Sequence, residues 1–160
     1  MIKTVAAVAY ISPQSHPILV HTFNKPKDEA IKYHYAAHTS LDVIEERIAA
    51  AAVGGKTPDC YLGLLYVLED LAVYGYITPL KVRIVVALPL TDTLVRDIEM
   101  IQLFKALHMA YYAAMSNPFL KLDAVSDSIP EHTPHALLTG GKWKGLQRRV
   151  DEIGRIIASG

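Results

Sequence analysis

The stretch from Cys60 to Pro89 constrains the fold more than any other part of the chain, because no other stretch is as continuously apolar. Turn-forming residues and prolines interrupt it, and proline lacks the amide hydrogen that a sheet ladder needs. The interruptions predict three successive strands, Tyr61–Leu68, Leu71–Ile77 and Val82–Leu88. Their short connections make neighbouring strands antiparallel, and apolar side chains of both parities require a helical cover on each face of the sheet.

Two shorter apolar runs near the N-terminus add further strands to this sheet. Val5–Ile11 and Pro17–Phe23 are separated by SPQSH, a loop of turn-forming residues, so the two runs are predicted to form a hairpin. Together with the three strands of the central stretch, they give a five-stranded, mostly antiparallel sheet.

A long helix is predicted between the hairpin and the central stretch. Asn24 can cap its first turn, Asp28 and Glu29 suit the positive end of the helix dipole, and Gly54-Gly55 ends it. Apolar or aromatic residues at steps of three and four mark the face expected to cover the sheet. These residues are Ile31, Tyr35, His38, Leu41, Ile44, Ile48 and Ala51.

Two more helices are predicted after the central stretch. The first is capped by Thr91-Asp92-Thr93 and stops before Asn117-Pro118, because the residue before a proline is pushed out of the helical region. Its apolar stripe consists of Leu94, Ile98, Ile101, Phe104, Leu107, Tyr111 and Met115. The second covers residues 144–158 and is amphipathic, with Leu146, Val150, Ile153 and Ile157 on its apolar side. The class is therefore α+β, with the order β-β-α-β-β-β-α-α.

Length and charge narrow the classes of function. A chain of 160 residues is expected to form one domain over 1–160, with an irregular loop at 122–141. The formal net charge is zero, which argues against nucleic acid as a partner. The single cysteine, Cys60, fits a reducing compartment and is expected to be a small buried residue. We expect neither a secretory signal nor a membrane-spanning helix.

Four histidines are the basis for an alternative in which the chain binds a metal ion. His34 and His38 are four residues apart on the first helix, a spacing that can hold a metal, and the loop residues His132 and His135 could add ligands. This pattern is the basis for a second hypothesis, a metal-binding module or an enzyme. Because His38 lies on the predicted apolar stripe, a core histidine is the favoured interpretation over a metal ligand.

Other candidate motifs favour structural interpretations. Residues 50–57, AAAVGGKT, approach a phosphate-binding loop, but here they close a helix instead of following a strand. No catalytic serine, cysteine or paired carboxylate pattern is present, so no catalytic residue, cofactor or metal is predicted. Arg148 and Arg149, with Lys142 and Lys144, could touch lipid headgroups or an acidic partner, although a solvated helix face is favoured. Tyr74 and Tyr76 could line a contact surface.

Three segments carry a resemblance to a known family. KYHYAAHTSLDVIEERI at 32–48, YLGLLYVLEDLAVYGYITPLKVRIVV at 61–86 and YYAAMSNPF ending at 119 resemble, in this order, the trafficking protein particle complex (TRAPP) subunit 2-like proteins, relatives of sedlin. The chain differs at Leu120, where the family usually has tyrosine, at the longer loop 122–141, and at Leu146-Gln147, where the family has Phe-Asp.

The resemblance implies a fold, a function and candidate contact residues. The fold is longin-like (profilin-like), with one long helix on one face of the sheet and two on the other. The implied function is that of a non-catalytic subunit of a vesicle-tethering complex in endoplasmic reticulum to Golgi and intra-Golgi transport. Implied partners are other longin-type and Bet-type subunits and, indirectly, a Rab GTPase, at the cytoplasmic side of these membranes. Asp42, Asn117, Pro118 and Phe119 match family positions and are the candidate partner-binding residues.

Overall fold

The computed structural model describes residues 2, 4–23, 30–55, 59–90, 95–116 and 144–159. Within these residues, five strands and three helices follow the predicted order. The strands are β1 (Ala7–Ile11), β2 (Pro17–Thr22), β3 (Tyr61–Leu68), β4 (Leu71–Ile77) and β5 (Arg83–Pro89), and the helices are α1 (Ala30–Val53), α2 (Asp97–Met115) and α4 (Lys144–Ser159).

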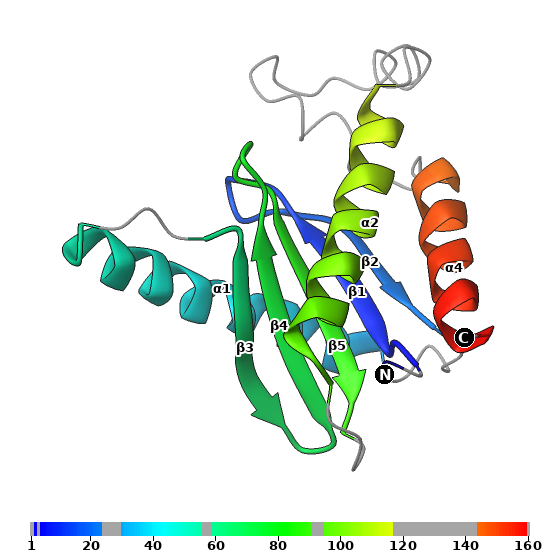
Figure 1. The fold of residues 1–160 in the computed structure, drawn as a ribbon, viewed down its shortest axis with the longest axis horizontal. Coiled ribbons are helices and arrows are strands. Elements are labelled where there is room, and N and C mark those ends of the chain that lie inside the picture. Colours follow the sequence, from blue (N-terminus) through cyan, green and yellow to red (C-terminus); the bar gives the residue numbers. More distant parts are fainter. Residues whose placement is uncertain are drawn as a thin grey trace.

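The strands form one antiparallel sheet in the order β2-β1-β5-β4-β3 (Figure 1). Strands β3, β4 and β5 form a meander, and β1 and β2 form the predicted hairpin. The two parts are joined by antiparallel pairing of β1 with β5, in which Ala7 lies opposite Ala87. This pairing places β1 inside the sheet and leaves β2 and β3 at its edges.

Helix α1 covers one face of the sheet, and α2 and α4 cover the other (Figure 1). Strand β1 shows why both covers are needed. Val8 and Tyr10 pack on the side of α2 and α4, whereas Ala7, Ala9 and Ile11 pack on the side of α1. All of these residues are buried. The α+β class is confirmed, and the architecture is consistent with the longin-like fold that the resemblance implies.

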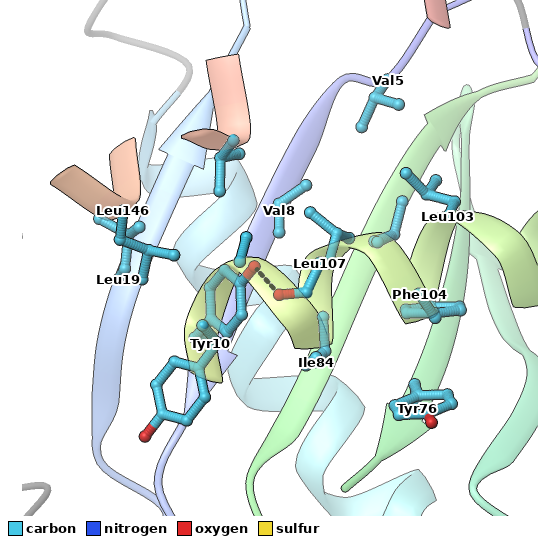
Figure 2. Close-up of a cluster of buried hydrophobic side chains, with 14 of the residues drawn as sticks. Val5, Val8, Tyr10, Leu19, Tyr76, Ile84, Leu103, Phe104, Leu107 and Leu146 are labelled. Carbon is cyan, nitrogen blue, oxygen red and sulfur yellow. Dashed lines mark hydrogen bonds between the residues drawn. The ribbon is translucent and has the colours of Figure 1, made fainter. Parts of the chain in front are cut away.

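Aromatic side chains organise the core beneath α2 (Figure 2). The Tyr10 hydroxyl donates a 2.8 Å hydrogen bond to the Leu107 carbonyl, and its ring stacks on Tyr111 with the ring centroids 5.5 Å apart. Tyr76 stacks on Phe104 at 5.3 Å. Because the polar tip of Tyr10 is satisfied by the helix backbone, the ring can be fully buried without an unpaired hydroxyl.

The core beneath α1 differs from the predicted stripe. Its helical contribution comes from Tyr33, Ala36, Ala37, Ser40, Leu41 and Ile44. Ile31 and Tyr35, which were expected to cover the sheet, are 76% and 64% exposed, and His38 is exposed as well. The prediction holds for Leu41 and Ile44 but was wrong for Ile31, Tyr35 and His38, because steps of three and four fit two neighbouring faces of the helix. Small residues allow the closest approach to the sheet, so the alanine-rich face is the one that packs.

The remaining helices agree with the prediction except at one end. Helix α4 buries Leu146 and Val150, as expected. Helix α2 begins only at Asp97, after Arg96, which makes no side-chain capping bond, and Ile98 is 68% exposed. The predicted cap, residues 91–93, lies outside the described residues. Cys60, directly before β3, is exposed and not buried as predicted.

Candidate partner-binding surface

The outer face of α1 is the candidate partner-binding surface. Residues at steps of three and four place one exposed set on the sides of the helix that are not buried against the sheet. This set, called here the α1 outer face, comprises Ile31, His34, Tyr35, His38, Asp42, Glu45 and Glu46. Glu45 lies at its border, where a carboxylate oxygen is 3.4 Å from the guanidinium of Arg83 in β5. Large apolar side chains near the helix start are therefore followed by a group of carboxylates. Exposed apolar groups next to charged ones are typical of surfaces that contact other proteins.

Asp42, the candidate contact residue on α1, lies in this face, and its role in partner binding stays a prediction. Its side chain is exposed, whereas the preceding Leu41 is buried against the sheet. Within the described part of the chain, no hydrogen bond or ion pair engages the Asp42 carboxylate. It is therefore available to accept hydrogen bonds from a cationic side chain of another protein.

Several interactions fix α1 to the sheet and so fix the position of its outer face. The Lys32 ammonium lies 2.8 Å from an Asp70 carboxylate oxygen and 2.9 Å from a Glu69 carboxylate oxygen in the β3–β4 turn. The hydrogen bond to Asp70 raises the pKa of Lys32 most, and the hydrogen bond to Glu69 raises it further. The Tyr66 hydroxyl of β3 donates a 2.6 Å bond to the Ala36 carbonyl. These contacts hold α1 against β3 and the turn that follows it.

Another α1 side chain reaches past the face of the sheet to its edge. The Arg47 guanidinium donates hydrogen bonds to the backbone carbonyl groups of Leu62 and Leu64 in β3. Gly63 lies between these acceptors with φ of 76°, where the pairing register with β4 shifts. A positive φ favours glycine, so the sequence permits the local bend at this point.

Of the four candidate contact residues, the structure describes Asp42 alone. Asn117, Pro118 and Phe119 lie outside the described residues, so their role stays a prediction. Helix α2 does end where expected, because Ser116 caps it with an amide that donates to the Tyr112 carbonyl. This end belongs to the helix layer on the opposite face of the sheet from α1 (Figure 1). Asp42 and the end of α2 therefore do not share a surface.

The histidine pair on α1 faces solvent. His34 and His38 are both exposed, so the interpretation of His38 as a core histidine was wrong. In the portion of the chain that the structure describes, no group of three or more His, Cys, Asp or Glu residues could hold a metal ion. His132 and His135, the other suggested ligands, lie outside that portion.

The remaining candidate motifs also have defined places. Tyr76 is buried against Phe104 and so cannot line an exposed surface, whereas Tyr74 is half-buried. Arg148 and Arg149 are exposed on α4, where Asp151 is engaged by His21 at 2.6 Å. The segment at 50–57 closes α1 at Val53, and its last two residues lie outside the described ones. None of the three described helices is long and apolar enough to cross a membrane.

Sequence reasoning missed a groove between α2 and α4. It has a volume of about 390 Å³ and is mainly apolar. Its apolar lining comes from Ile2, Leu103, Ala106, Ile153, Ile156 and Ile157. Ile156, outside the predicted stripe of the last helix, was the available signal, because it widens the apolar face of that helix.

Comparison with known proteins adds evidence from sequence similarity. The family model described as Sedlin matches residues 10–131. A trafficking protein particle complex subunit 2-like protein of Bos taurus is 41% identical over 115 residues, which cover 70% of this chain and 80% of the relative. The protein of the same name from Dictyostelium discoideum is 35% identical over 130 residues, covering 79% and 89%.

Proposed function

The chain belongs to the sedlin family, and from this premise we propose that it is a subunit of a trafficking protein particle complex. The observation that carries the proposal is the similarity to relatives of that name, which extends over 70% of the chain in one case and 79% in another. The described side chains support a role in assembly more than one in chemistry, since the exposed face of α1 displays apolar and acidic groups suited to protein contact.

We propose for this chain the specific partners, role and location that the family resemblance implies. The subunit contacts longin-type and Bet-type subunits and contributes without catalysis to an assembly that promotes nucleotide exchange on a Rab GTPase. It works at the cytoplasmic side of endoplasmic reticulum and Golgi membranes, where it is held peripherally by the complex. The whole chain acts as one unit in this role.

The α1 outer face is the proposed contact surface. A partner that fits it has apolar side chains to cover Ile31 and Tyr35 and a lysine or arginine to meet Asp42. Charge complementarity of this kind selects the partner and sets the register of the contact. Because α1 is fixed to the sheet through Lys32 and Tyr66, little order has to be gained on binding.

The test is affinity capture from the cells in which the protein is native, with chemical cross-linking and identification of the recovered chains. We expect the parent protein to recover other subunits of the complex. Asp42→Lys should recover at least about tenfold less of the subunit that cross-links to α1, because a buried like charge opposes the partner's cation.

Glu152→Lys is the matched control, since it makes the same charge change at an exposed position of α4. It should recover the parent amount. Recovery of no complex subunits by the parent protein would refute the proposed function. Equal recovery by Asp42→Lys and Glu152→Lys would leave that function standing and refute the assignment of the α1 outer face.

A further inference from the structure

The outer edge of β3 has the features of a strand that pairs with other chains. This edge strand pairs with β4 on one side, and its eight residues, YLGLLYVL, include no charged residue and no proline. Leu64 and Val67 are 42% and 53% exposed. Long, uncharged edge strands of high β propensity add strands from other molecules unless something blocks them.

The opposite edge of the sheet is protected in a different way. Strand β2 begins with Pro17 and is shorter, with six residues. His21 of β2 is bonded to Asp151 of α4, so a helix is attached to this strand. Proline, short length and a covering element are common means of preventing edge pairing, and β3 lacks the first two.

The side chain of Arg47 in α1 contacts the backbone of β3. Its guanidinium donates to the carbonyl groups of both Leu62 and Leu64, so these two carbonyl groups face the same side chain. These carbonyl groups are the acceptors that the amides of an added strand would need. The bulge at Gly63 further distorts the edge at this point.

We propose that Arg47 closes the outer edge of β3 against pairing with β3 of a second copy of this chain. We name a second copy as the partner because the residues of β3 are compatible with pairing to themselves. In an antiparallel β3–β3 pair about a two-fold axis, the same uncharged residues meet one another, and no like charges on the strand oppose the contact. The exposed Leu64 and Val67 would then be covered by their counterparts. This inference does not depend on the proposed function.

The test measures self-association of the full chain by light scattering over a series of concentrations. Arg47→Ala should dimerise with a dissociation constant at least about tenfold tighter than that of the parent protein. The control Arg149→Ala removes an exposed arginine from α4 and should behave as the parent does. Hydrogen exchange should show slower exchange of the β3 amides in the Arg47→Ala dimer only.

A second change separates strand pairing from general loss of structure. Adding Leu64→Lys to Arg47→Ala should return association to the parent level, because each chain would then carry a charge on the edge that has to pair. Arg47→Lys, which keeps the charge but not the planar fork, should give intermediate association even if Arg47→Ala fails to fold. Parent-like association of both Arg47 variants would overturn the proposal, as would a dimer that Leu64→Lys does not reverse.

Discussion

At the scale of single residues, Tyr10 shows how the core combines burial with a satisfied polar group. Its ring is fully buried, and its hydroxyl donates to the carbonyl of Leu107 in α2 (Figure 2). Burial raises the pKa of Tyr10 above the usual value of 10.0, and the neighbouring Tyr111 adds to the effect. The folded chain therefore holds the phenolic proton more tightly than the unfolded chain does.

This difference predicts how Tyr10→Phe changes stability with pH. At neutral pH the variant should lose about 0.5–1.5 kcal/mol of unfolding free energy with the hydrogen bond. A raised pKa stabilises the fold fully below pH 10.0, and that contribution is lost as pH rises beyond it. The parent should therefore lose up to about 1.4 kcal/mol more per pH unit than the variant.

Urea unfolding at a series of pH values measures this effect. The two stability curves should run parallel below pH 10 and converge above it. Tyr112→Phe removes a hydroxyl at an exposed position of α2 and serves as the control. Curves that stay parallel at high pH would contradict the assignment to Tyr10.

At the scale of elements, the attachment of α4 depends on a close approach to the end of β2. A methyl group at Gly154 would lie 2.4 Å from a ring carbon of Phe23. That ring is held by an edge-to-face contact with His21, with centroids 4.8 Å apart. At Gly154, helix α4 therefore packs closely against the residue that follows β2.

Gly154→Ala tests this packing against helix propensity. Alanine favours a helix by about 1 kcal/mol over glycine, but overpacking costs about 1–3 kcal/mol. We expect a net loss of stability of about 1 kcal/mol in denaturant unfolding, which should become a gain in a Phe23→Ala background. Gly145→Ala, in the same helix with nothing near the added methyl, should stabilise the chain in both backgrounds.

The elements also show where local sequence signals are sufficient. The predicted bounds of β3 and β4 match the structure because turn residues between them act locally, and Glu69 adopts the positive φ of 49° that such a turn uses. Packing against the sheet, and not a local signal, decides which face of α1 is buried. Its alanines were weak as an apolar pattern, yet their small size selects the buried face.

The candidate surface also contains one feature that was expected from the sequence and one that was not. The exposure of Asp42 agrees with the family resemblance. The contact of Arg47 with β3 could not be predicted, because it depends on how closely α1 approaches the edge of the sheet, which no local pattern encodes.

At the scale of the whole molecule, the sheet is completed by pairing between distant parts of the chain. Strand β1 pairs with β2 through a short loop, but its other neighbour is β5, with Ala7 opposite Ala87. The meander and the N-terminal hairpin thus share one sheet only through the β1–β5 ladder.

A fragment that ends at Leu80 tests the importance of this ladder, because it contains the first four strands and lacks β5. We expect the β1 amides of the fragment to exchange rapidly with solvent, since an isolated hairpin is marginally stable. The fragment should also show no cooperative unfolding transition. In the full chain the same amides should be protected. Protected β1 amides in the fragment would show that the hairpin is stable without β5.

The β1–β5 pairing also has a consequence for the order of events during synthesis. Strand β1 is translated before the other four strands, yet the residues that complete its second ladder follow 72 to 80 positions later, from Ile11 opposite Arg83 to Ala7 opposite Ala87. Closing such a long loop slows folding relative to forming local contacts. The nascent hairpin of β1 and β2 therefore cannot complete its packing during early synthesis. The side chains of Val8 and Tyr10 are buried only after β5 and α2, which pack against them, have been translated.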